Sequence, residues 1–444
     1  MVSFCTSCIE SGNSCHECEI KWVKPGDVSK YFLGSILNGG GSHPNTNRNP
    51  SEPHYGRGSN DKNASIQDWL DVADEVYLES IDKSRGGAGI PIIWGTDAVH
   101  GHNNVIGATL FPHNIGLGAA NDPSLLRRIG EITAREVAVT GIDWIFAPTV
   151  ATVKDNRWGR TYEGYSSESD IVGKYSREIV IGIQGDNLSE LRSNPEKLIS
   201  TAKHFVGDGG TYRGIDQGNT ILSLEDLLEQ HGQGFYTAID AGVQTIMASF
   251  NSWNGDKIHG NKYLLTDILK DQMGFDGFVV SDWFAARSTG PSIKAGLSLE
   301  MPGKGQWYGP ERIIEALEND ECSESELDGI VKDMLRLMQR TNAFNGVGGG
   351  EEKQIDSAEH RELIRHAATE GTVLIKNDGV LPLDPDILGT LALIGPNARS
   401  AKIMGGGSAG VRSYRNVSPL SALTERTTLE ITYAQGCDID RTTP

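Results

Sequence analysis

The stretch GFDGFVVSDWFA, residues 274–285, places an apolar run directly before a carboxylate and an indole. The run 277–281 has the length and composition of a strand that is buried on both faces. Strands of this kind belong to parallel sheets, and the residues after their carboxyl ends line up along one edge of the sheet. We therefore expect Asp282 and Trp283 at the rim of a parallel sheet.

The same pattern recurs upstream of this strand. Apolar runs at 90–94, 144–148, 200–205 and 245–250 alternate with amphipathic stretches at 125–140, 171–185, 224–240 and 264–272. Helical spacing also predicts helices at 68–83, 292–295, 309–317 and 327–340. Apolar strands separated by amphipathic helices predict an α/β fold with right-handed crossovers. So many repeats over about 250 residues favour a closed (β/α) barrel, with an open doubly wound sheet as the alternative.

The rest of the chain divides at stretches rich in glycine and polar residues. Residues 38–65 read as a long loop, and 344–356 as a linker. We predict a cysteine-rich N-terminus at 1–18, the barrel at 19–343, and a second α/β unit at 357–444. That unit should contain a helix at 358–371 and strands at 372–376, 391–395 and 429–433. Three strands are too few to bury both sheet faces, so we expect an incomplete α/β sandwich.

The four N-terminal cysteines, Cys5, Cys8, Cys15 and Cys18, form two C-x2-C pairs separated by six residues. The usual gap between such pairs in a zinc site is about 12 to 20 residues. Local disulfides, or a start that is not native to the domain, therefore compete with zinc.

The composition restricts the possible partners. The formal net charge of -19 would repel nucleic acid or an anionic membrane surface. The sequence contains no apolar run of about 18 residues, so we expect no membrane span. The chain has no strand-linked GxGxxG, no GxxxxGK[ST] and no HExxH, so we expect no cofactor. No signal peptide is visible, but three glycosylation sequons favour the secretory pathway for the full-length protein; they begin at Asn63, Asn187 and Asn416. The oligomeric state stays open.

Polar and aromatic residues gather at or near the ends of the predicted strands. They are Asp97, Arg160, Lys203, His204, Met247, Asp282 and Trp283. In a parallel barrel these ends converge on one mouth. Carboxylates and basic groups can together hold vicinal hydroxyls, and an indole can stack on a sugar ring.

Four of these residues also have a purely structural interpretation. Asp97 and Asp282 could cap helices. Arg160 could form a surface ion pair with Glu163 or Glu168, and Trp283 could belong to the core. The Lys203–His204 pair is harder to explain in this way, because two buried basic groups need a polar or anionic partner.

Five segments, in order, resemble glycoside hydrolase family 3, with β-glucosidases and exo-β-glucanases as the closest kin. They are GTDAVHGHNNVIGATLFPHNIGLGAANDPSL (95–125), RWGRTYEGYSSE (157–168), AKHFVGDGGT (202–211), ASFNSWNG (248–255) and GFVVSDW (277–283). The resemblance covers roughly residues 20–440. It implies a barrel followed by an α/β sandwich, with a sugar bound between them and hydrolysed with retention through a covalent glycosyl-enzyme.

The resemblance also implies a role for each candidate residue. Asp282 would be the nucleophile, and Trp283 would line the sugar subsite with Met247 nearby. The glucose-holding residues map onto Asp97, Arg160, Lys203 and His204. The substrate would be a β-glucoside or β-glucan, cut at its non-reducing end.

The chain departs from the family pattern in two places, and it also differs from one branch of the family. Many relatives have Tyr at the position of Phe250. The family's acid/base Glu lies late in the second domain, and we expect it beyond Pro444, since neither Glu163 nor Glu300 lies where the pattern would place it. The N-acetylglucosaminidase branch reads KHFPGHGD where this chain reads KHFVGDGG, so Asp208 and Gly210 replace its His-Asp dyad. The alternatives are therefore a non-catalytic sugar-binding remnant and, less favoured, a β-N-acetylglucosaminidase.

Overall fold

A computed structural model describes residue 23 and residues 26–38, 43–46, 54–55, 63–301, 309–341, 343–345, 355–384, 388–404, 407 and 409–438. The predicted N-terminal unit 1–18, with Cys5, Cys8, Cys15 and Cys18, lies outside the described residues, as does most of the predicted linker. Cys322 and Cys437 are free cysteines.

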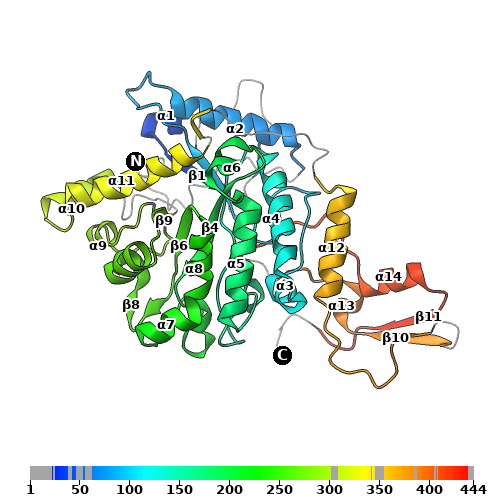
Figure 1. Ribbon diagram of the computed structural model, residues 1–444. Coiled ribbons are helices and arrows are strands. Elements are labelled where there is room, and N and C mark those ends of the chain that lie inside the picture. Colours follow the sequence, from blue (N-terminus) through cyan, green and yellow to red (C-terminus); the bar gives the residue numbers. More distant parts are fainter. Residues whose placement is uncertain are drawn as a thin grey trace.

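Six parallel strands form the central sheet (Figure 1). They are β1 (Ser35–Asn38), β2 (Ile93–Thr96), β3 (Trp144–Ile145), β4 (Ile199–Phe205), β6 (Thr245–Ala248) and β9 (Phe278–Val280). Their order in the sheet follows their order in the chain. A small separate sheet contains β5 (Asn219–Thr220), β7 (Ser252–Trp253) and β8 (Asp256–Lys257). Each central strand predicted from an apolar run is therefore confirmed, whereas β1 was not predicted.

The sheet curls around its own interior. Leu37 of β1 and Val280 of β9 come from opposite ends of the strand order, yet both belong to one buried cluster with Trp144 of β3. Met334 and Leu337 of helix α11 (Glu324–Arg340) join the same cluster. Side chains from the first and last strands can share one interior only if the sheet bends back on itself, as in a barrel. The predicted barrel-like α/β fold is confirmed.

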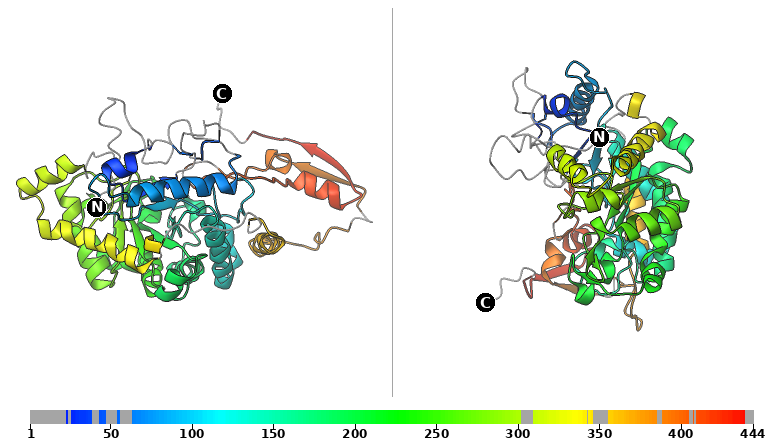
Figure 2. Two further views of the ribbon diagram at one scale, coloured as in Figure 1. Left: turned by 90° about the horizontal axis from the view of Figure 1, so that it is seen from above. Right: turned by 90° about the vertical axis from the view of Figure 1, so that its left-hand side faces the viewer.

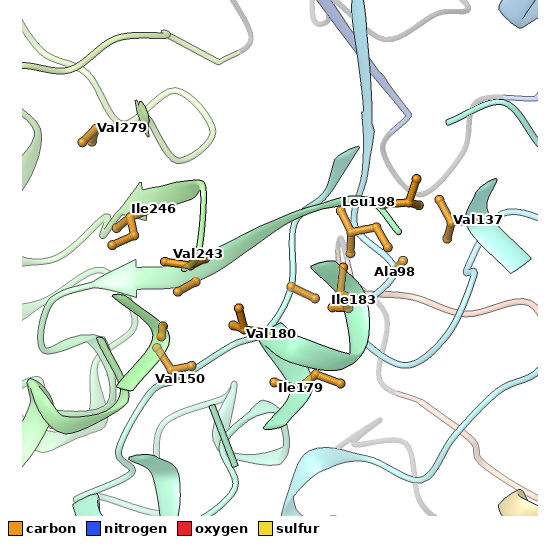
Figure 3. Close-up of a cluster of buried hydrophobic side chains, with 14 of the residues drawn as sticks. Ala98, Val137, Val150, Ile179, Val180, Ile183, Leu198, Val243, Ile246 and Val279 are labelled. Carbon is orange, nitrogen blue, oxygen red and sulfur yellow. The ribbon is translucent and has the colours of Figure 1, made fainter. Parts of the chain in front are cut away.

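Helices cover the outer face of the sheet. Helix α4 (Pro123–Ala138) packs along α5 (Ser169–Gln184), which packs along α8 (Gln233–Asp240). Figure 3 shows Val180 and Ile183 of α5 among the apolar side chains that fill the space between helices and sheet. Helix α4 begins after Asp122, whose side chain accepts the N–H groups of Ser124 and Leu125.

Further α-helices belong to the described part of the barrel. They are α1 (Asp27–Tyr31), α2 (Ile66–Ile81), α3 (Asn114–Ala120), α6 (Leu188–Ser193), α7 (Leu224–His231), α9 (Gly290–Lys294) and α10 (Pro310–Glu318). Two sequence expectations need correction. The single helix expected at 224–240 is two helices, α7 and α8, that meet at Gly232. The helix expected at 264–272 is a π-helix, Tyr263–Gln272.

The second unit is a partial α/β arrangement. It contains α12 (Ala358–Glu370), β10 (Thr390–Ile394), α13 (Pro396–Arg399), α14 (Pro419–Arg426) and β11 (Glu430–Ala434). The strands β10 and β11 pair in parallel, and they lie to one side of the barrel (Figures 1 and 2). The strand predicted at 372–376 is wrong. This segment has no neighbouring strand in the described part of the chain, and Ile375 is 93% exposed.

Helix α12 connects the two parts of the chain. It packs on α3 and α4, and His360 Nδ1 lies 2.7 Å from Glu136 Oε1 of α4. Both side chains are buried. The sequence placed this helix in the second unit, and the predicted domain boundaries stay a prediction.

Among the described residues, no helix combines the length and the apolar composition needed to cross a membrane.

Candidate active site

A cavity of about 420 Å³ lies at the carboxyl ends of the central strands. All seven residues singled out from the sequence line it: Asp97, Arg160, Lys203, His204, Met247, Asp282 and Trp283. Asp97 follows β2 directly, Lys203 and His204 lie near the end of β4, and Met247 belongs to β6. The parallel sheet thus brings together residues that lie far apart in the sequence.

One side of the cavity holds a buried ion pair. Lys203 Nζ lies 3.2 Å from Asp97 Oδ1, and only 2% of the Lys203 side chain is exposed. Burial raises the pKa of Asp97, while Lys203 acts in the opposite direction. The interpretation of Asp97 as a helix cap is wrong, because the next helix, α3, begins at Asn114. Asp97 instead presents its carboxyl group to the cavity beside an ammonium group.

Arg160 is held by Glu163, which lies outside the cavity lining, and by His204, which is part of it. Its Nε and Nη2 donate to the two carboxylate oxygens of Glu163, at 2.7 and 2.9 Å. Nη2 also donates to His204 Nε2 at 3.1 Å. The expected pairing of Arg160 with Glu163 therefore exists, but Glu163 is buried rather than on the surface. Burial raises the pKa of Glu163, and the larger combined effect of Arg160 and its other basic neighbours lowers it to about 2.

His204 is buried between Arg160 and an aspartate. Its Nδ1 lies 2.8 Å from Asp208 Oδ2, and the N–H of Gly209 donates to Asp208 Oδ1 at 3.0 Å. Burial, followed by the nearby charges of Arg160 and Lys203, holds the pKa of His204 well below its usual value. His204 is therefore a neutral imidazole at neutral pH.

Asp282 lies close to these groups after the end of β9. Its Oδ1 accepts the N–H of Trp283 at 2.7 Å, and its Oδ2 lies 3.9 Å from His204 Nε2. Its own N–H donates to Nε2 of His259 at 2.9 Å. Burial lowers the pKa of His259 to about 3, so this ring is neutral and able to accept. No helix begins at Asp282, because α9 starts at Gly290, so the helix-cap interpretation is wrong.

The ionisation of Asp282 reflects opposing effects. Burial raises its pKa, whereas Arg160, the N–H of Trp283 and Lys203 all favour the carboxylate. The side chain is 16% exposed, and it faces the cavity rather than the interior of the fold. A carboxyl group at this position can approach a ligand in the cavity.

Aromatic side chains form the apolar part of the wall. Trp283 is partly buried against the interior cluster and also lines the cavity, so it contributes to both, and its role towards a sugar stays a prediction. Trp158, Phe146 and Phe250 line it as well. The indole N–H of Trp158 donates to Asp216 Oδ1 at 3.0 Å. A wall that mixes aromatic faces and carboxylates suits a ligand with apolar faces and hydroxyl edges.

Sequence reasoning did not assign several residues that shape the site. Asp208, Asp216 and Trp158 line the cavity, and Glu163 and His259 hold its members in place. Asp208 follows the Lys203–His204 pair by four residues, a spacing that could have indicated it. His259 carried no such signal, because it comes from a short 3-10 helix far from β9 in the sequence. The described part of the chain shows no cluster of three His, Cys, Asp or Glu side chains suited to a metal ion.

The chain matches the models of two protein domains. Residues 13–337 match the glycosyl hydrolase family 3 N terminal domain, and residues 372–438 match the glycosyl hydrolase family 3 C-terminal domain. Among solved structures, a mutant of an exo-1,3/1,4-β-glucanase (ExoP) from a Pseudoalteromonas species is 40% identical, with a TM-score of 0.82 over 95% of this chain and 70% of that chain. A mutant β-glucosidase from Listeria innocua in complex with laminaribiose is 27% identical, with a TM-score of 0.74 over 85% and 52% of the two chains.

Curated relatives are similar over most of this chain. A β-glucosidase of Rhizobium radiobacter is 33% identical over 84% of this chain and 46% of its own length. A probable β-glucosidase I of Aspergillus niger is 32% identical over 75% of this chain and 39% of its own length. The chain spans about half the length of the curated relatives it matches. With both domains matched and the cavity at the strand ends, the chain belongs to glycosyl hydrolase family 3.

Proposed function

We propose that the whole protein is a retaining glycosidase that removes β-linked glucose from the non-reducing end of oligosaccharides or β-glucans. The observation that carries the proposal is the convergence of Asp282, Asp97, Lys203 and Arg160 on one cavity at the strand ends. The β-glucosidases and the exo-β-glucanase among the relatives support the same substrate class.

In this proposal Asp282 attacks the anomeric carbon and forms a covalent glycosyl-enzyme, which water then hydrolyses. The N–H of Trp283 fixes Oδ1, which leaves Oδ2 to act as the nucleophile. A rigid strand end favours such a role, because the attacking oxygen must be held in place. Glu163 is unsuited to be the general acid, since its pKa of about 2 leaves it without a proton at neutral pH.

The other groups would recognise the sugar. Asp97 would accept hydroxyl protons, and Lys203 and Arg160 would donate to hydroxyl oxygens. Because these side chains are already paired and buried, little side-chain entropy remains to be lost when a sugar binds. The indole of Trp283 would stack on the apolar face of the ring.

The experiment uses a 2-deoxy-2-fluoro-glucoside with an activated leaving group, which needs no protonation to depart. Mass spectrometry should find an adduct on the peptide that contains Asp282, and Asp282→Asn should abolish it. Asp155→Asn, which removes an aspartate that pairs with Arg157 at the surface, should leave the labelling unchanged. An adduct on a different carboxylate would refute the assignment of Asp282.

The absence of any adduct on the folded chain would favour the second candidate, a sugar-binding remnant without catalysis. Titration with glucose would then still produce saturable binding. Comparison of an aryl glucoside with an aryl N-acetylglucosaminide tests the third candidate, which the Asp208 and Gly210 replacements disfavour.

We also propose that the full-length protein enters the secretory pathway. Asn63, Asn187 and Asn416, the acceptor residues of the three sequons, are all exposed. Endoglycosidase treatment of protein from its native host should therefore change its electrophoretic mobility.

A further inference from the structure

Four side chains form a continuous hydrogen-bonded chain, of which Asp208, His204 and Arg160 line the cavity and Glu163 lies behind Arg160. Asp208 contacts His204, His204 contacts Arg160, and Arg160 contacts Glu163. A carboxylate therefore lies at each end, with an imidazole and a guanidinium group between them. Asp208, His204 and Glu163 are each less than a tenth exposed.

The direction of each proton in this chain follows from the chemistry of its members. A guanidinium group can only donate, so His204 Nε2 must accept from Arg160. A neutral imidazole carries one proton, so that proton lies on Nδ1 and points to Asp208 Oδ2. Asp208 Oδ1 in turn accepts the N–H of Gly209. Both oxygens of Asp208 are thus acceptors, which is the pattern of a carboxylate.

The same assignment of donors and acceptors determines which N–H groups of Arg160 remain for a ligand. Its Nε–H and one N–H of Nη2 point to Glu163, and the second N–H of Nη2 points to His204. The two N–H groups of Nη1 are then left for the cavity that Arg160 lines. The orientation of the guanidinium plane decides where these two donors point.

We propose that Asp208 is a positioning residue that fixes the Nδ1–H tautomer of His204 and, through His204, orients Arg160 in the cavity. That Nη1 then donates to a sugar hydroxyl rests on the function proposed above. Asp208 needs no contact with the ligand for this role. It acts because the other tautomer would aim an N–H of His204 at an N–H of Arg160, and that arrangement has no acceptor.

The substitution Asp208→Asn tests this assignment with almost no change of shape. The N–H of Gly209 requires an oxygen at the Oδ1 position, so the new NH2 group must occupy the position of Oδ2. An NH2 group there donates to His204 Nδ1 and drives the ring proton to Nε2, against Arg160. The control is Asp216→Asn, which removes a carboxylate from the same cavity but leaves the contacts of His204 intact.

The measurement is a long-range ¹H–¹⁵N correlation spectrum of the 444-residue chain labelled at histidine, with His204→Gln to assign the signal. Burial raises the pKa of Asp208 to about 7, so the spectra are recorded at about pH 8.5, where the carboxylate form dominates. Wild type and Asp216→Asn should show the Nδ1–H pattern for His204, and Asp208→Asn should show the Nε2–H pattern. The affinity for glucose should fall about tenfold or more in Asp208→Asn, the range expected for one misdirected hydrogen bond from a charged group.

The outcomes separate this proposal from the proposed function. An Nε2–H pattern in the wild type would overturn the proposal without any variant, so its test does not depend on whether Asp208→Asn folds. An unchanged Nδ1–H pattern in Asp208→Asn would overturn it too. If the wild type binds no saccharide although the tautomers behave as described, the proposed function fails while the positioning role stands.

Discussion

Removal of the negative charge of Glu163 should destabilise the protein in a way that depends strongly on pH. Glu163 is 2% exposed and neutralises Arg160 in the cavity wall. Its pKa is lowered from 4.5 to about 2. This difference of about 2.5 units corresponds to about 3 kcal/mol of stability at neutral pH. Loss of one partner of a buried ion pair costs about 3–5 kcal/mol, and the lower end applies here because Arg160 is 27% exposed to the cavity.

The sign of the pH dependence follows from the lowered pKa. The carboxylate of Glu163 stabilises the fold fully above the pKa of the unfolded chain, near 4.5, and the stabilisation is lost as pH falls towards 2. At about pH 3.5 the folded protein should have lost roughly 1 kcal/mol of this contribution. Glu163→Gln has no charge to lose, so the stability difference between the two proteins should narrow by the same amount.

Urea unfolding at about pH 7 and about pH 3.5, followed by tryptophan fluorescence, measures both differences. The matched control is Glu178→Gln. Glu178 pairs with Arg127 at 2.7 Å, but that arginine is 36% exposed, so the substitution should cost no more than about 1 kcal/mol. A Glu163→Gln variant as mild as the control, or a stability difference that is the same at both pH values, would refute the reasoning.

Two further predictions test the packing of the barrel. Gly118→Ala should destabilise the protein severely, because a Cβ at this position would lie 1.7 Å from the carbonyl oxygen of Tyr165. In the control Gly116→Ala, in the same helix, the new Cβ meets nothing closer than 3.9 Å, so this variant should be tolerated. Thermal unfolding of both variants measures the difference, and equal unfolding midpoints would contradict the prediction. Phe278→Ala should lower the free energy of unfolding by about 3–5 kcal/mol, because the ring is fully buried against Trp144 inside the sheet. A decrease below about 1 kcal/mol in urea unfolding would contradict this and show that the interior is loosely packed.

The central strands and the location of the cavity could be predicted because both depend on local pattern. An apolar run followed at once by Asp282 or by the Lys203–His204 pair indicates a strand and also the end that carries the site. The parallel topology then determines that these ends meet. No pairwise information was needed beyond the alternation itself.

The parts that could not be predicted depend on contacts between distant segments. Ile375 lies in a run with strand composition, but a strand needs a neighbour, and the described chain gives this segment none. The position of Asp208 behind His204 required the path of the loop after β4. The pairing of Arg160 with Glu163 was foreseen as one possibility, but its burial became apparent only with the cavity in place.

The uneven balance of charge in the cavity wall has a thermodynamic consequence. Among the described lining residues, four aspartates stand beside one arginine and one lysine. This excess creates a negative electrostatic potential in a space partly shielded from water, and a protonated amine should be held there more tightly than a neutral molecule of the same shape. Burial raises the pKa of Asp208 to about 7, so an arriving cation should drive protons off the fraction of Asp208 that is protonated at neutral pH. The heat of its binding, measured by calorimetry, should then vary with the ionisation enthalpy of the buffer that takes those protons up.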